Sequence, residues 1–335
     1  MSVDSSAMLI NGLRTEFTKT YRDALNRQSD GRLAMVMDLD GVGATNREHD
    51  FGYREAAPHI ERWVRGNAIP TEGMASKTYK VVVHNWGKRC EWHEDDREDD
   101  QTGSLMQDVA QLGDSAGLLA ERFFFDLLLG QTNTLPVTIN APDGNSLFIS
   151  SARFEYSSGN TVASFSANST QDCVDGYHDA LNAFRQFKDG KGQPLWNESV
   201  IDQGVLIICP AADEKQWTRA LESKIQVLGI NAAGVEHAGS SEVAAAGVTN
   251  IIQDTNRNVT LWPTQRVSTN EAYILLKGTP VKPFFVMNRR ALRRRDSLGS
   301  MNNSDRTRTT GMEYVQWDLR QGAGINLPYG CIKLA

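Results

Sequence analysis

Apolar residues recur at every fourth position near the start of the chain, between residues 8 and 25. They follow two serines, Ser5 and Ser6. The recurring residues are Leu9, Leu13, Phe17, Tyr21 and Leu25. This spacing puts the five side chains on one face of a helix, and serines are common where a helix begins. We therefore expect an amphipathic N-terminal helix that docks against another part of the protein.

The following stretch, residues 26–53, is polar and broken by glycines, with one short strand expected at 33–39. Two further strands are expected at 60–64 and 78–86, and the loop between them contains Gly66, Pro70 and Gly73. Residues 26–53 therefore predict a linker, and the two strands predict a long hairpin.

The most regular apolar pattern runs from Ser104 to Leu129. Apolar residues recur there at steps of three and four, and Ser104 with Gln107 forms a capping box at the start. Gly130 provides the stop. A helix over 104–129 would be about 39 Å long at 1.5 Å per residue. We expect one continuous helix that spans the molecule.

Shorter elements fill the rest of the chain. One helix capped by Asp172 is expected before Gly190, and another capped by Asp213 before Gly229. The apolar run 205–209 predicts a strand buried on both faces, and the Gly, Ala and Ser-rich run 229–249 predicts a loop. Strands are expected at 258–262, 272–276, 281–287 and 314–320, with a basic segment at 289–310 between the last two. This order predicts an α+β fold in which C-terminal strands gather against one long helix.

Charge is unevenly distributed along the 335 residues. The net charge of −6 argues against a globally basic nucleic-acid binder. An acidic run at 91–100 nevertheless contains seven carboxylates and one arginine, and a basic run at 289–295 contains five arginines. The arginines are Arg289, Arg290, Arg293, Arg294 and Arg295, with Arg306 and Arg308 farther along.

The two runs allow three interpretations. They could pair across a contact between separate copies of the chain, since arginine forks bind carboxylates in a bidentate manner. The arginines could instead bind nucleic-acid phosphates, although no aromatic residue lies among them, or they could form a solvated loop. We expect the contact between copies. Its acidic candidates are Glu94, Asp95, Asp96, Asp99 and Asp100.

Catalytic and metal-binding patterns are weak. Asp38 and Asp40 lie in a D-x-D-G-V motif like the nucleophile loop of haloacid-dehalogenase-type phosphatases, but a hairpin pattern follows where such an enzyme has a helix. The acidic run with His93 lacks the glycine turn and ligand spacing of a calcium loop. The four cysteines form no C-x-x-C pair. We therefore expect no enzyme activity, metal or cofactor, and the hydropathy predicts no membrane span.

Several short motifs occur in a distinctive order. They begin with the aromatic and proline-containing stretch 51–66, which includes Trp63 and Arg65, and the turn Arg97-x-Asp99-Asp100-x-x-Gly103. They continue with Asp143-Gly144-x-x-Leu147-Phe148, the run 205–210 that ends in Cys-Pro, Lys282-Pro283-Phe284 and Trp317-Asp318-Leu319-Arg320. In this order the motifs resemble those of the Mu-like phage major head subunit family, over residues 50–335. Two features depart from that family: the histidine usual after the third motif is missing near Ala152 and Arg153, and residues 289–310 are unusually basic.

The resemblance implies the capsid fold of tailed phages, of the Hong Kong 97 type. Residues 1–51 would then be an N-terminal arm and 52–93 an extended hairpin loop. Residues 94–195 and 271–335 would form a peripheral domain around a spine helix at 104–129, and 196–270 an axial domain.

The same resemblance implies a major capsid protein that self-assembles into pentamers and hexamers, and so into an icosahedral phage head around double-stranded DNA. Portal, scaffold and decoration proteins would be further partners, and the protein would assemble in the host cytoplasm and remain in the virion. Trp63, Arg65 and the two charged runs would form contacts between subunits. Because helical pattern begins within ten residues of Met1, we expect no N-terminal scaffold domain that maturation removes. The alternative within the structural class is a tail-tube or ring protein, which would form open stacks.

Overall fold

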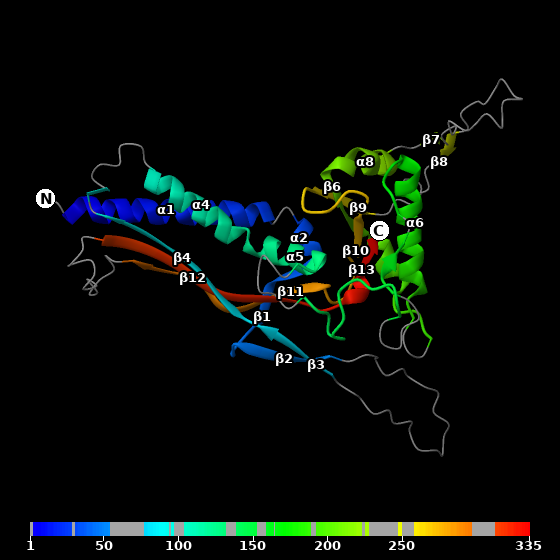
Figure 1. Ribbon diagram of the computed structural model, residues 1–335, viewed down its shortest axis with the longest axis horizontal. Coiled ribbons are helices and arrows are strands. Elements are labelled where there is room, and N and C mark those ends of the chain that lie inside the picture. The colour runs from blue at the N-terminus through cyan, green and yellow to red at the C-terminus, as the bar shows by residue number, and fades with distance from the viewer. Residues whose placement is uncertain are drawn as a thin grey trace, which may run out of the picture. The chain divides into compact units, whose positions relative to one another are not determined.

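A computed structural model describes most of the chain (Figure 1). The described residues are 3–28, 31–53, 77–93, 95–96, 104–131, 139–152, 159–163, 165–188, 192–222, 225–227, 247–249, 258–296 and 312–335. Contacts between residues divide the chain into two compact units. Unit 1 comprises Met1–Gly52, Thr78–Asn140 and Phe284–Ile325, and unit 2 comprises Tyr53–Lys77, Ala141–Pro283 and Asn326–Ala335.

Unit 1 is built on a four-stranded sheet of order β1-β11-β12-β4. These strands are β1 (Met37–Gly43), β11 (Phe284–Asp296), β12 (Met312–Ile325) and β4 (His84–His93). β1 runs parallel to β11, and the two other pairings are antiparallel. A separate two-stranded sheet joins β2 (Glu48–Tyr53) and β3 (Lys77–Val82). The expected strand at 314–320 is confirmed. The single strand expected at 78–86 is divided at Val83 into β3 and β4, which belong to different sheets, and the strand expected at 60–64 lies outside the described residues.

Two findings in this sheet correct the sequence prediction. Residues 289–296, expected to start a basic segment between two strands, continue the strand β11. Residues 32–36, expected to begin a strand, form the short helix α2 (Arg32–Val36), and β1 follows it directly. Pairing with β12 explains the first difference, because ladder hydrogen bonds along β11 outweigh the weak strand preference of an arginine-rich sequence.

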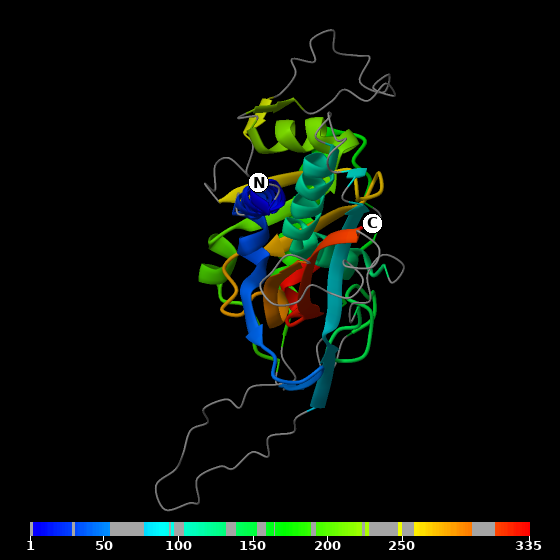
Figure 2. The same ribbon diagram turned by 90° about the vertical axis from the view of Figure 1, so that its left-hand side faces the viewer.

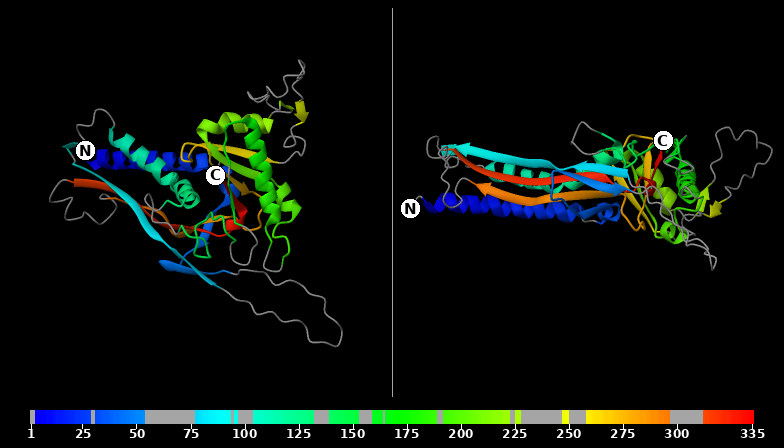
Figure 3. Two further views of the ribbon diagram at one scale, coloured as in Figure 1. Left: turned by 45° about the vertical axis from the view of Figure 1, so that its right-hand side comes forward. Right: turned by 90° about the horizontal axis from the view of Figure 1, so that it is seen from below.

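Helices lie along one side of the long strands in unit 1 (Figures 1 and 3). They are α1 (Val3–Gln28), α4 (Ser104–Gly117) and α5 (Leu119–Leu129). Figure 2 looks along α1 and shows α4 beside it. Leu13 and Phe17 of α1 pack with Val109 of α4 and with Val315 and Trp317 of β12. The Phe17 and Trp317 rings are stacked, with centroids 4.1 Å apart. The expected N-terminal helix and its docking are thus confirmed.

Glycines allow α1 and α4 to approach closely. A Cβ atom at Gly113 would lie 2.9 Å from the carbonyl oxygen of Phe17, and one at Gly117 would lie 2.4 Å from the Cβ of Ala24. Both distances are shorter than van der Waals contact, so the two positions accept only glycine at this helix separation. The close approach adds dispersion contacts along both helices.

The long helix expected at 104–129 is interrupted at one residue. Leu118, with φ −84° and ψ 6°, separates α4 from α5, although hydrogen bonds from Leu118 N to Asp114 O and from Arg122 N to Leu118 O bridge the break. Gly130 ends α5 in the left-handed conformation, at φ 63°, as the sequence predicts. The expectation of one uninterrupted helix is therefore wrong at Leu118 and right at both ends.

Tyr79 is the polar member of a second apolar cluster in unit 1. It is buried beside Val81, Phe285 and Met287, and its hydroxyl oxygen accepts a hydrogen bond from Ile325 N at 3.1 Å. Burial raises the pKa of Tyr79 to about 12, although the Ile325 N–H opposes the shift. The hydroxyl therefore satisfies a backbone donor and stays protonated at neutral pH.

We expect Tyr79→Phe to lower the free energy of unfolding at pH 7 by about 1 kcal/mol, because the Ile325 N–H loses its acceptor. An unfolded tyrosine has a pKa of about 10, so the folded state holds this proton more tightly and wild-type stability falls as pH rises from about 10 to about 12. The variant should lack that part of the decline, about 2–3 kcal/mol. Urea unfolding at pH 7, 10 and 11.5 measures both effects, and an identical decline in both proteins would contradict the prediction.

Unit 2 contains a five-stranded mixed sheet of order β5-β13-β10-β6-β9. Its strands are β5 (Thr161–Val162), β13 (Cys331–Leu334), β10 (Ala272–Leu276), β6 (Val205–Pro210) and β9 (Val259–Thr264). A 3-10 turn, η3 (Pro328–Gly330), leads into β13. The strands expected at 205–209, 258–262 and 272–276 are confirmed, and β6 is buried along its whole length.

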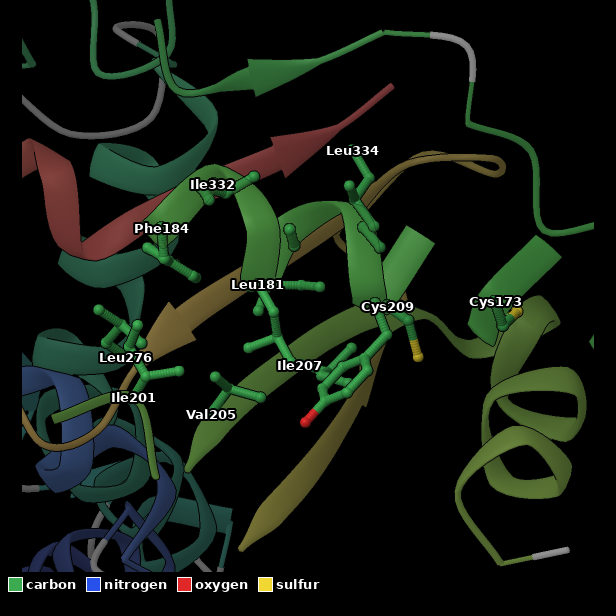
Figure 4. Packing of buried hydrophobic residues seen from close by; sticks show 14 of the residues in the cluster. Cys173, Leu181, Phe184, Ile201, Val205, Ile207, Cys209, Leu276, Ile332 and Leu334 are labelled. Carbon is green, nitrogen blue, oxygen red and sulfur yellow. The ribbon is translucent and has the colours of Figure 1, made fainter. Parts of the chain in front are cut away.

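One face of this sheet packs against α6 (Thr170–Gln186). Figure 4 shows Leu181 and Phe184 of α6 meeting Val205, Ile207 and Cys209 of β6. The helices α7 (Glu198–Asp202) and α8 (Glu214–Glu222) add Ile201 and Trp217 to the same core. Helices α6, α7 and α8 and the sheet therefore share one apolar core in unit 2.

Both expected caps in unit 2 need correction. The N-cap of α6 is Ser169 and not Asp172. The Ser169 hydroxyl accepts a hydrogen bond from Asp172 N, and the Asp172 carboxylate accepts one from Ser169 N. Asp172 is thus the third residue of a capping box. Asp213 ends the 3-10 turn η1 (Ala211–Asp213) before α8, and its carboxylate accepts from Asn270 N at 3.3 Å. Beyond α8, strands β7 (Ile225–Val227) and β8 (Gly247–Thr249) pair, where a helix end and a loop were expected.

The D-G-x-x-L-F motif forms a tight turn that leads to the other face of the sheet. Asn145 N donates to the Asp143 carboxylate, and Gly144 adopts φ 83°, a conformation that favours glycine. Phe148 then contacts Tyr273 of β10, with ring centroids 5.2 Å apart. The physical role of the motif is to turn the chain and cover β10.

Asn160 holds this covering segment in place. Its buried side-chain amide donates to the carbonyl oxygens of Leu147, Pro328 and Cys331, and its side-chain oxygen accepts from Ile149 N. The four hydrogen bonds are 2.8–3.2 Å long. One side chain therefore joins segment 147–149 to the start of β13.

Candidate subunit interface

The basic run lies on β11, next to the centre of β12. Register pairs Arg293 with Asp318, Arg294 with Trp317 and Arg295 with Gln316. Because Trp317 faces α1, the period of two puts Asp318 and Gln316 on the opposite face of the sheet. Arg293 and Arg295 therefore lie on the face away from the helices, and Arg294 lies on the helix side.

Two irregularities in the β11–β12 ladder bring Arg290 to the same face. The register shifts between Asn288 and Arg290 and again between Arg290 and Arg293. In a regular strand, residues three apart point to opposite faces, but an inserted residue at a bulge restores the same side. Arg290 and Arg293 consequently both reach Asp318.

Three arginines converge on the Asp318 carboxylate. Arg293 Nε lies 2.9 Å from both carboxylate oxygens, Arg290 Nη2 donates to Oδ2, and Arg295 Nε lies 3.8 Å from Oδ1. The Asp318 side chain is only 11% exposed, whereas those of Arg290, Arg293 and Arg295 are 31, 42 and 54% exposed. The Asp318 carboxylate is thus nearly buried, and the more exposed guanidinium groups surround it.

Gly87 on β4 has no side chain to cover the Asp318 carboxylate. It pairs with Asp318, and a Cβ atom there would lie 2.8 Å from Trp317 O and 3.2 Å from Asp318 Cβ. Beside it is a shallow hollow of about 490 Å³, lined by residues that include Arg89, Arg290, Arg293, Arg295 and Asp318. We call these four arginines the arginine face. Arg89 also lies 3.6 Å above the centre of the Tyr314 ring and 2.6 Å from Glu91.

We expect Asp318→Asn to lower the free energy of unfolding of the unassembled subunit by about 1–3 kcal/mol, because three guanidinium groups would lose their shared anion. The partial exposure of the arginines limits the loss. Arg295→Gln is the matched control and should cost less than about 0.5 kcal/mol, since this side chain is the most exposed and most distant. Urea unfolding measures both, and equal effects would contradict the central role of Asp318.

Only part of the acidic run falls within the described residues. Asp95 and Asp96 are helical and lie two and three residues beyond the end of β4. Asp96 accepts a hydrogen bond from His93 N, and Asp95 N donates to His93 Nδ1, both at 3.3 Å. Glu94, Asp99 and Asp100 lie outside the described residues, as do Trp63 and Arg65. The described pair is exposed at the end of the sheet.

The alternative catalytic residues do not form a site. Asp38 and Asp40 both belong to β1, which is followed by a turn and β2 and not by the helix of a phosphatase. Within the described part of the chain, no three His, Cys, Asp or Glu side chains are grouped to hold a metal ion. No described helix is long and apolar enough to cross a membrane.

Solved structures share this fold despite low sequence identity. The capsid of cyanophage P-SCSP1u is 9% identical, with a TM-score of 0.51 over 89% of this chain and 85% of that one. The capsid of Myoviridae phage XM1 is 12% identical, with a TM-score of 0.51 over 90% of each chain, and Mycobacterium phage Patience is 11% identical, with a TM-score of 0.51 over 97 and 87%. No curated protein sequence matches the chain.

The fold is therefore the tailed-phage capsid fold of the Hong Kong 97 type, with mixed helices and sheets. Residues 77–334 match the model of a family described as phage capsid protein. The chain belongs to this family, so it is a structural component of a phage particle and not an enzyme. The family does not support the phosphatase interpretation of Asp38 and Asp40 or the tail-tube alternative.

Sequence reasoning missed three residues of the site. Asp318 was noted only as part of a motif, and Gly87 and Arg89 were not singled out. The alternation of Val315, Trp317 and Leu319 along β12 could have indicated that Asp318 faces away from the core. The position of Gly87 opposite Asp318 depends on strand register across 231 residues of sequence, which local pattern does not encode.

Proposed function

We propose that this chain is a major capsid protein that assembles into pentamers and hexamers and forms an icosahedral head around double-stranded DNA. The single observation that supports this most is the family match over residues 77–334, which spans most of both units. The similar folds of the cyanophage and Myoviridae capsids agree with it. We further assign the chain to the Mu-like major head subunits, because its motifs occur in the order of that group.

We propose that unit 1 carries the arm, the hairpin base and the peripheral domain, and that unit 2 without its segment Tyr53–Lys77 is the axial domain. The resemblance implied a peripheral domain at 94–195 and 271–335 and an axial domain at 196–270. Residues 141–195 and 326–335 belong to the same compact unit as residues 196–270. We therefore propose that the axial domain includes them. The extended loop is then the part of 52–93 beyond β2 and β3.

The proposed partners are other copies of the chain, packaged DNA on the inner face, and portal, scaffold and decoration proteins. We propose that assembly takes place in the host cytoplasm before the protein is found in virions. The arm, extended loop and charged runs would supply the contacts between subunits, which in such shells fix register and specificity more than affinity.

Expression of the chain alone and with its neighbouring genes tests this function. Negative-stain electron microscopy and the mass by size-exclusion chromatography should show closed polyhedral shells, or rings of five and six subunits. Open stacked tubes would instead favour the tail-tube alternative, and a monomer that never assembles under either condition would contradict the proposal.

A further inference from the structure

We propose that the arginine face binds the acidic segment, residues 91–100, of a second copy of this chain. This inference deepens the proposed function and rests on it, because it requires copies packed side by side. It names what occupies the hollow beside Gly87, which cannot be deduced from the fold alone.

The arginine face carries more N–H donors than the Asp318 carboxylate can accept from, so it can bind a second anion. A guanidinium group carries five N–H donors, whereas a carboxylate accepts about four hydrogen bonds. Arg290, Arg293 and Arg295 share the single carboxylate of Asp318, which lies at the floor of the hollow. One carboxylate cannot accept from all of these donors, and the buried Arg290 Nε has no hydrogen-bond partner among the described residues. A second carboxylate at the rim would find the planar, bidentate geometry that guanidinium groups favour.

Among the described acidic residues of this segment, Glu91 lies 2.6 Å from Arg89 of its own chain, at one side of the hollow, whereas Asp95 and Asp96 do not reach the hollow. β4 register puts Gly87 opposite Asp318, and His93 lies at the far end of the strand, about 20 Å away at 3.4 Å per residue. The hydrogen bonds to His93 hold Asp95 and Asp96 in a turn at that end. Carboxylates from another copy can reach the hollow because they approach from outside the sheet face.

Charge complementarity favours a second copy over nucleic acid as the occupant. The segment 91–100 offers seven carboxylates within ten residues. The rest of the chain opposes a polyanion, because the net charge is −6 although the arginine run is included. Every subunit in a shell carries both partners, so each contact of this kind can repeat around a ring.

Cross-linking in mixed-label particles tests the inference. The variant Arg293→Lys/Arg295→Lys keeps both positive charges and introduces amines that carbodiimide joins to carboxylates. Particles assembled from equal amounts of light and nitrogen-15 chains are treated and digested, and linked peptides are identified by mass spectrometry. We expect about half of the links between position 293 or 295 and segment 91–100 to join a light and a heavy peptide. A link from position 293 to Asp318 arises within one copy and should carry a single label, which provides the internal control.

Several results would overturn the inference. Single-label links alone would show that the segment folds back on its own chain. A second contrary result is the absence of links to 91–100. If the lysines at 293 and 295 then react less with carbodiimide only in particles that contain DNA, the ligand of the arginine face is phosphate. Failure of the unsubstituted chain to assemble would overturn the proposed function, and this inference with it.

Charge exchange gives a second, independent readout. Arg293→Glu/Arg295→Glu should reduce particle yield at least tenfold, and adding Asp95→Arg/Asp96→Arg should restore part of the yield. Arg219→Glu on α8 is the control and should lower the yield far less, because this exposed arginine lies outside the arginine face. Circular dichroism shows whether all variants fold. If they do, a wild-type yield of particles from Arg293→Glu/Arg295→Glu would contradict the proposal.

Discussion

Replacing Gly117 by leucine is expected to lower the free energy of unfolding by about 2–4 kcal/mol, because the side chain would overlap Ala24 of α1 and force the two helices apart. In an isolated helix the same change would stabilise by up to about 1 kcal/mol, since glycine is a poor helix former. The expected loss therefore has the opposite sign from helix propensity. Urea unfolding measures it, and hydrogen exchange should show reduced protection along α1.

The matched control is Ser115→Leu, which adds the same side chain to an exposed position of α4 two residues away. It should change the stability by less than about 0.5 kcal/mol. A stabilising effect of leucine at both positions would show that α1 does not pack on α4 in solution.

Asn160→Asp is expected to cost more than about 3 kcal/mol, although it changes a single amide to a carboxylate of equal size. The new oxygen would face the carbonyl oxygens of Leu147, Pro328 and Cys331, which now accept hydrogen bonds from the Asn160 amide. Repulsion and burial both disfavour the ionised form and raise the pKa of the new carboxyl group in the folded state. The penalty should therefore grow as pH rises through the unfolded value of about 3.9, and thermal unfolding between pH 3.5 and 7 would reveal this slope.

Asn197→Asp is the matched control for this prediction. Asn197 is an exposed N-cap of α7, where aspartate is equally favourable and the helix dipole attracts its charge. The control should be neutral or slightly stabilising. A loss at Asn197 equal to that at Asn160 would indicate that charge, and not the buried network, determines the effect.

Local pattern predicted elements whose apolar spacing is regular. The four-residue period from Leu13 to Tyr21 identified α1, the run 205–209 identified β6, and Gly130 identified the end of α5. In each case the signal lies within one element. The break at Leu118 was missed because both flanking segments follow one apolar stripe, so the sequence period continues through it.

Pairing between distant segments explains what local pattern did not predict. Residues 289–296 form a strand because β12 pairs with them, and no alternation of apolar and polar residues marks this arginine-rich stretch. The candidate site follows the same rule. The charge runs were visible in the sequence, but the bulges that turn Arg290 and Arg293 toward Asp318 depend on register. Asp318 itself lies between two strands that are remote from it in sequence.

The strand order of unit 1 also determines when the sheet can form during synthesis. β1 and β4 are its two edges, and both are made before β11 and β12, which lie between them. More than 200 residues separate the end of β4 from the start of β12. At a translation rate of about 5–20 residues per second, β4 waits on the order of 10–40 s for its partner strand. Throughout that interval it is an unpaired strand on a ribosome, and neighbouring ribosomes on the same message carry identical ones. The four-stranded sheet of unit 1 can therefore be completed only late in synthesis, after both central strands have been made.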